Sequence, residues 1–277
     1  MELAARENQA GFTEDTELAL RAPIILTPRT PEVPIPFDSP VIQTVNTIWD
    51  EANFGIQREP VVVGSIEDKA GFENTEGIKK ISWLPIKLPG TEYVLPPEYE
   101  QFREALEKMI GFEHAINPDV DETYAYFTVD AGFVEAGNTH RKKGAHSDGF
   151  QSILIDPKNK TSRFYAAFNA VPTLHHNQPF DVSHLDPGID NFFWEFERQV
   201  DPARTEEVDP YDIVMMDAYT VHEAGEATED TSRVFMRLSY EYRPFNRRGN
   251  AINPYLDYDW GEQVPCRCQI PPLLLLR

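Results

Sequence analysis

The chain has 277 residues, 41% of them hydrophobic, so it is long enough to bury a sizeable core. Its 46 acidic and 25 basic residues give a formal net charge of −21, which argues against nucleic acid or an anionic membrane as partner. No apolar run approaches the roughly 20 residues that span a bilayer, and MELAARENQAGFTED lacks the regions of a secretory signal, so we expect a soluble, cytoplasmic protein with a small-molecule substrate.

The N-terminal part is expected to support a single domain over residues 1–277. Residues 1–40 contain TPRTPEVPIPFDSP, whose prolines remove backbone donors and favour an extended arm on the surface. Residues 41–120 are expected to form a helical support region, with helices over 38–52 and 96–112. The apolar positions that recur at helical spacing are Val41, Val45, Ile48 and Trp49 in the first helix, and Phe102, Leu106, Met109 and Ile110 in the second.

Residues 121–245 show a different pattern, in which short β-like runs are separated by polar, glycine or proline residues. The runs are TYAYFTVDA, GFQSILID, SRFYAAFNAV, YDIVMMDAYTVH and TSRVFMRLSYEYRPF. One helix, DNFFWEFERQV, interrupts them, and residues 246–277 form a C-terminal tail. This order predicts a mainly β (α+β) fold, an antiparallel sandwich or barrel with flanking N-terminal helices.

The stretch GAHSDGF contains a possible metal site. In a strand alternate side chains share a face, so His146 and Asp148 would point to the same side. His222, at the end of the apolar run YDIVMMDAYTVH, is the best third ligand. Two histidines and one carboxylate suit non-haem iron(II), whereas hydrolytic zinc sites use other spacings such as His-Glu-x-x-His. A His-x-Asp triplet also arises by chance, so further evidence is needed.

That evidence comes from TSRVFMRLSYEYRP. One face of this predicted strand carries Val234, Met236, Leu238, Tyr240 and Tyr242 and should be buried. The opposite face carries Arg233, Phe235, Arg237 and Ser239. A guanidinium fork beside a hydroxyl is well suited to bind the distal carboxylate of a metal-chelating dicarboxylate.

Together HSD, the distal His222 and Arg-x-Ser resemble the iron(II)- and 2-oxoglutarate-dependent dioxygenases, over roughly residues 120–245. The resemblance implies a double-stranded β-helix, a distorted jelly roll, as the catalytic core over 121–245. It implies that His146, Asp148 and His222 bind Fe(2+), with 2-oxoglutarate and dioxygen as cosubstrates. It further implies oxidation of a small molecule, by hydroxylation, desaturation or ring closure, with release of succinate and carbon dioxide.

The same resemblance suggests which residues hold the cosubstrate. Arg237, helped by Ser239, would bind the 5-carboxylate of 2-oxoglutarate, and Arg233 would assist or contact the metal-proximal carboxylate. Tyr126 and Thr128, on the preceding strand, are candidates for hydrogen bonds to 2-oxoglutarate.

Other interpretations remain open. A cupin-like isomerase or a non-catalytic ligand-binding jelly roll would share the fold, but cupins usually carry His-x-His where this chain has His146 and Asp148. The basic run HRKKG either draws an acidic substrate to the site or forms an exposed turn, and we favour the turn. His175 and His176, in PTLHHNQ, are expected to be loop residues.

Overall fold

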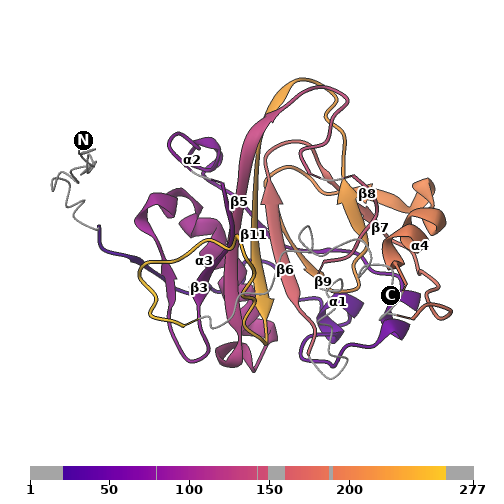
Figure 1. The fold of residues 1–277 in the computed structure, drawn as a ribbon, viewed down its shortest axis with the longest axis horizontal. Helices are drawn as coiled ribbons and strands as arrows, with labels where there is room; N and C mark the ends of the chain where they lie inside the picture. Colours follow the sequence, from indigo (N-terminus) through magenta and orange to yellow (C-terminus); the bar gives the residue numbers. More distant parts are fainter. Residues whose placement is uncertain (1–20, 79, 142, 149–159, 187–189, 260–277) are drawn as a thin grey trace, which may run out of the picture.

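The computed structural model describes residues 21–78, 80–141, 143–148, 160–186 and 190–259. Its larger sheet has six antiparallel strands in the order β2 (Val61–Ser65), β9 (Asp212–Asp217), β6 (Arg163–Phe168), β11 (Thr231–Glu241), β5 (Tyr124–Val134) and β3 (Ile81–Lys87). A smaller sheet has the order β10 (His222–Ala224), β7 (Thr173–His176) and β8 (Thr205–Glu207). The smaller sheet lies over one side of the larger one, and α3 (Arg103–Ile116) covers the other (Figure 1). The predicted mainly β, jelly-roll fold is confirmed.

The central strand β11 separates the two sides of the larger sheet. Its side chains at Val234, Met236, Leu238 and Tyr240 pack in the apolar core beneath α3, as predicted. Phe235 instead packs with side chains of β6 and β9 in a second core between the sheets. Because Arg237 lies opposite Thr128 on β5 and Ala166 on β6, its side chain also enters this interior.

Residues 41–120 are not simply the helical support that we expected, since β2, β3 and β4 (Tyr93–Leu95) also lie there. The helix expected over 38–52 is reduced to α1 (Pro40–Gln43); it ends at the C-cap Thr44, and the left-handed φ of 64° at Asn46 prevents a helix from continuing through residues 44–52. The helix expected over 96–112 is present as η2 (Pro97–Phe102) and α3. The remaining helices are η1 (Glu51–Gly55), α2 (Lys69–Glu73), η3 (Val120–Glu122), α4 (Phe192–Gln199) and η4 (Pro202–Arg204).

One predicted strand is divided in the structure, and another lies where the structure is not described. The run over residues 211–222 is divided into β9 and β10, because the Asp217 carboxylate accepts hydrogen bonds from Tyr219 N and Thr220 Oγ1 and so forms a turn. The strand predicted over 149–156 lies outside the described residues. Among the residues that are described, no helix combines the length and apolar character needed to cross a bilayer.

The N-terminal arm is docked along its described part. Strand β1 (Ile24–Leu26) pairs with β4, and Arg29 N donates to the Glu107 carbonyl on α3 at 3.1 Å. The Arg29 guanidinium also pairs with the Glu107 carboxylate at 3.1 Å. The arm therefore closes one edge of the core beneath α3.

Gly111 on α3 permits this approach, and Gly111→Ala should disrupt it. A Cβ at this position would lie 1.6 Å from the Arg29 carbonyl oxygen, so the arm or the helix must move. We expect a loss of about 1–3 kcal/mol in the free energy of unfolding. Urea unfolding measures this loss, and limited proteolysis reports release of the arm. Gly55→Ala is the control, because no heavy atom lies within 4 Å of its added Cβ. Equal stability of the two variants would contradict the prediction.

Candidate metal centre

The structure brings His146, Asp148 and His222 together at one end of the space between the sheets. One ligand atom from each residue lies within 4.8 Å of the others. We expected His146 to lie in a strand. Instead, it forms an isolated antiparallel bridge with His222. The two residues exchange backbone hydrogen bonds of 2.9 and 2.8 Å, which fixes their Cα atoms side by side.

Backbone carbonyls orient both imidazole rings. His146 Nδ1 lies 2.8 Å from the Gly144 oxygen, and His222 Nδ1 lies 3.0 Å from the Thr220 oxygen. A carbonyl can only accept, so each Nδ1 carries the proton and each Nε2 keeps its lone pair for a metal. Burial lowers the pKa of His222 to about 4, which keeps its ring neutral at neutral pH. This donor set fits a divalent cation.

Asp148 supplies the carboxylate. Its Oδ2 lies 4.0 Å from His222 Nε2 and accepts a hydrogen bond from Arg237 Nη1. Burial alone would raise the pKa of this carboxyl, but Arg237 and His222 hold it below its ordinary range. Asp148 is therefore an anion, the form in which a carboxylate binds a metal.

Arg237 and Ser239 carry polar atoms that lack partners within the described part of the chain. Arg237 Nε and Ser239 Oγ are both buried, with residue exposures of 5% and 0%, and no described residue bonds to either atom. The Arg237 guanidinium lies between the rings of Trp83, at 4.9 Å, and Phe164, at 5.5 Å. Buried polar atoms are normally paired, so this wall of the site is suited to a polar ligand.

Trp83 was missed by the sequence analysis. It adopts a left-handed φ of 55° at an irregularity in β3 between Ile81 and Leu84. Its backbone N–H donates to Thr128 Oγ1 at 3.0 Å instead of continuing the strand pairing. The bulge brings the indole against the Arg237 guanidinium. The only signal in the sequence is the broken alternation of apolar residues in ISWLPI.

The other predicted cosubstrate residues lie on the same side of the sheet but have different contacts. Arg233 is 1% exposed, and its Nε donates to the Ala170 and Val171 carbonyls at 2.9 Å, so backbone rather than the metal ligands holds it. The Tyr126 hydroxyl accepts from Phe245 N at 2.7 Å. Thr128 is the acceptor for Trp83 described above. The roles of these three residues in binding 2-oxoglutarate therefore stay predictions.

A buried network behind His222 was also missed. The Asp217 carboxylate accepts from Arg58 Nη1 at 2.7 Å and Thr44 Oγ1 at 2.7 Å, and Thr220 Oγ1 donates to it at 2.8 Å. Since the Thr220 carbonyl orients His222, this network fixes the turn that positions a predicted metal ligand.

His175 and His176 lie in strand β7 and not in a loop, which corrects our expectation. His175 is opposite His222 in the register of β7 and β10, with ring centroids 6.0 Å apart. Burial lowers the pKa of His175 to about 3, so a neutral imidazole lies next to the predicted metal ligand His222.

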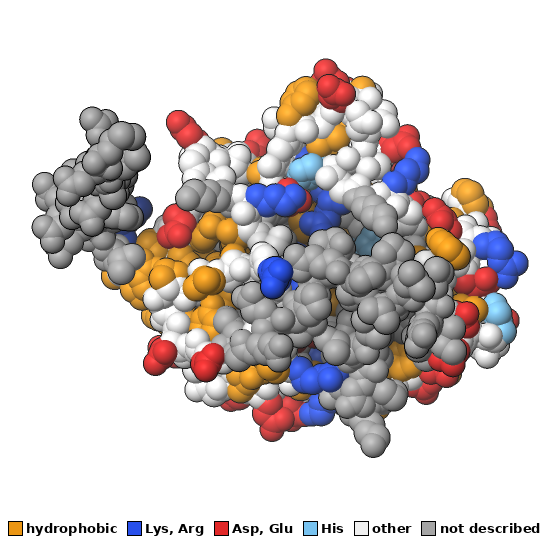
Figure 2. Space-filling view, in the orientation of Figure 1, with side chains coloured by type: hydrophobic (Ala, Val, Ile, Leu, Met, Phe, Trp, Pro, Cys, Tyr) orange, Lys and Arg blue, Asp and Glu red, His pale blue; other side chains and the backbone are white. Residues whose placement is uncertain are grey.

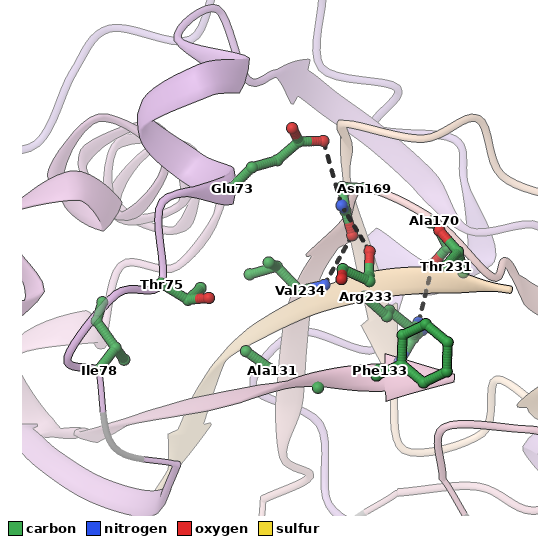
Figure 3. A pocket seen from close by; sticks show the side chains of 12 residues that line it. Glu73, Thr75, Ile78, Ala131, Phe133, Asn169, Ala170, Thr231, Arg233 and Val234 are labelled. Atoms are coloured by element: carbon green, nitrogen blue, oxygen red, sulfur yellow. Dashed lines mark hydrogen bonds between the residues drawn. The ribbon is translucent and has the colours of Figure 1, made fainter. Parts of the chain in front are cut away.

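A cavity of about 630 Å³ opens elsewhere, on the other side of the β5–β11 ribbon (Figure 3). Glu73, Ile78 and Phe133 line it, and Asn169 bridges Glu73 and the backbone N–H of Val234. None of the three triad residues lines this cavity, so it is separate from the metal centre.

No protein-family model matches the sequence, and no curated protein is similar to it. Among solved structures, the chain is similar to a Pseudomonas putida prolyl-4-hydroxylase, with 12% identity and a TM-score of 0.41 over 78% of this chain and 99% of that one. It is also similar to EvdO2 from Micromonospora carbonacea var. aurantiaca, with 12% identity and a TM-score of 0.40 over 71% and 92%. The non-heme alpha ketoglutarate dependent epimerase SnoN from nogalamycin biosynthesis gives 16% identity and a TM-score of 0.40 over 74% and 92%. Similarity this low says nothing about the reaction of this chain, so its function rests on the residues of the site.

Proposed function

We propose that the protein is an iron(II)- and 2-oxoglutarate-dependent oxygenase that oxidises a small molecule and releases succinate and carbon dioxide. The observation that carries this proposal is the combination of two ligand sets in one interior. His146 and His222 present Nε2 lone pairs next to the Asp148 carboxylate. Arg237 Nε and Ser239 Oγ, on the wall of the same interior, lack partners among the described residues.

The residues of the site fit both iron(II) and 2-oxoglutarate. His146, Asp148 and His222 would hold iron(II), leaving positions for a bidentate ligand and dioxygen. Arg237 and Ser239 would bind the distal carboxylate of 2-oxoglutarate, because a guanidinium fork and a hydroxyl match its oxygens. When bound, the iron and 2-oxoglutarate would supply the oxidative chemistry, and the protein would bind and orient the reactants.

The protein residues have separate tasks in this proposal. Trp83 and Phe164 pack against the Arg237 guanidinium, with ring centroids 4.9 and 5.5 Å from it, and restrict where it can point. The Gly144 and Thr220 carbonyls keep the ligand imidazoles in one tautomer. A cupin-like isomerase or a non-catalytic jelly roll could use the triad, but neither assigns a ligand to Arg237 and Ser239.

An anaerobic titration with iron(II) and 2-oxoglutarate tests the proposal. The wild type should bind one iron per chain and show the visible charge-transfer band of a chelated 2-oxo acid. Asp148→Ala should lose both signals, because it removes the anionic ligand and leaves Arg237 without its carboxylate partner. Asp38→Ala, which changes an exposed carboxylate, is the control. Absence of the band from wild type, or equal iron binding by Asp148→Ala, would refute the assignment.

A further inference from the structure

Three arginines, Arg141, Arg233 and Arg237, lie in or against β11, although the chain as a whole is strongly acidic. Arg141 and Arg233 both lie against the Phe235 ring, with guanidinium carbons 5.0 and 5.1 Å from its centroid. Arg237 lies two residues further along the same strand face. Figure 2 shows basic side chains gathered near a histidine above the centre of this face, while acidic side chains lie mostly around its edge.

These guanidinium groups affect one another. Burial and the neighbouring Arg141 lower the pKa of Arg233 to about 10. Burial, and then Arg237, lower the pKa of Arg141, while Asp148 and Asp130 oppose this effect. The guanidinium groups therefore repel one another, and an anion bound to Arg141 would relieve this repulsion.

In the described part of the chain, Arg237 keeps one unpartnered donor, Nε, which the proposed function assigns to 2-oxoglutarate, so Arg141 is the arginine of this group that is left for another ligand. Arg233 is held by two backbone carbonyls, and Arg237 by Asp148. Arg141 makes no hydrogen bond from its guanidinium to any residue that the structure describes. Among the described residues its one ion pair, to Asp130, is 3.7 Å long, and Asp130 already pairs with Lys80 at 2.6 Å. The Arg141 side chain is 39% exposed, so a ligand can reach it.

We propose that Arg141 binds a carboxylate of the substrate, so that the oxidised molecule is a small organic acid. This proposal rests on the proposed function and names the substrate class of that same site. With Arg237 assigned to 2-oxoglutarate and Asp148 to the metal, Arg141 is the guanidinium of this group that neither assignment uses, and it lies against Phe235, two residues before Arg237 on β11. Its planar fork matches a carboxylate, and the Phe235 ring holds that fork in place.

Fluorine NMR with manganese(II)-loaded protein and saturating 2-oxoglutarate tests this proposal. Trifluoroacetate is the anionic probe, and trifluoroethanol is its neutral counterpart. Bound manganese should broaden the trifluoroacetate signal selectively. Arg141→Gln should weaken trifluoroacetate binding about 10- to 100-fold, as expected for loss of a charge-assisted hydrogen bond. Arg141→Lys should recover part of the affinity, because it restores the charge without the fork.

Lys143→Gln is the matched control, since Lys143 is 67% exposed in the same loop and pairs with Glu226. It should leave trifluoroacetate binding unchanged. Failure of wild type to bind manganese and 2-oxoglutarate would refute the proposed function itself. If both bind, three results would overturn the carboxylate site alone. These are equal broadening of the two probes, no broadening of trifluoroacetate, and unchanged trifluoroacetate affinity in a folded Arg141→Gln protein.

Discussion

Arg237→Leu is expected to raise the 2-oxoglutarate concentration needed for half-saturation about 30- to 1,000-fold, which corresponds to about 2–4 kcal/mol for a sheltered, charge-assisted bidentate contact. Arg237 is only 5% exposed and lies between two aromatic rings, so water cannot replace the lost guanidinium effectively. Titration of succinate formation against 2-oxoglutarate measures the change.

Two further variants distinguish the loss of the carboxylate contact from nonspecific effects of replacing an arginine. Arg237→Lys keeps the charge but loses the fork and the stacked plane, so its affinity should lie between those of wild type and Arg237→Leu. Arg198→Leu, at a 71% exposed position on α4, should behave as wild type. Iron binding is measured separately, because Arg237 also donates to Asp148. Unchanged 2-oxoglutarate affinity in Arg237→Leu would remove the carboxylate anchor from this residue.

The second large effect concerns stability. Arg163 on β6 and Glu113 on α3 form an ion pair of 2.6 Å in which both residues are 0% exposed. Arg163→Met should lower the free energy of unfolding by about 3–5 kcal/mol, because it leaves the Glu113 carboxylate buried without its cation. Urea unfolding followed by tryptophan fluorescence measures this loss.

A compensating change tests the physical cause. Glu113 also accepts hydrogen bonds from Tyr165 OH at 2.8 Å and Asn117 Nδ2 at 2.6 Å. Glu113→Gln combined with Arg163→Met removes both charges; the Gln oxygen still accepts from Asn117 Nδ2, and its amide N–H2 can donate to the Tyr165 hydroxyl oxygen. The double variant should recover at least half of the lost stability. If it is as unstable as Arg163→Met alone, lost packing and not the uncompensated charge is the cause.

The sequence analysis identified the features of the site that depend on local spacing. The period of two in β11 placed Arg237 and Ser239 opposite the buried apolar face, and the structure has them there. The same period placed His146 and Asp148 on one side, although His146 forms only a bridge and not a strand. The local backbone geometry thus determines which way these side chains point, even where the structure has a bridge in place of the predicted strand.

Features that depend on distant contacts were not predictable in this way. Residues 41–52 show a helical pattern, but Thr44 instead donates to Asp217, far along the chain, and Asn46 reverses the backbone. Trp83 reaches Arg237 only because a bulge in β3 redirects it, and a bulge depends on pairing with β5. Tertiary pairing overrides local preference at both places.

The network around Asp217 has a thermodynamic consequence for the N-terminal part of the chain. Thr44 and Arg58 hold the turn that orients His222, so a cation that selects the native position of His222 must also favour the docked position of residues 40–58. A metal present at 100 times its dissociation constant stabilises the native state by about 2.7 kcal/mol. Amide hydrogen exchange in residues 40–58 should therefore slow when metal is added, although none of these residues is in the predicted ligand set.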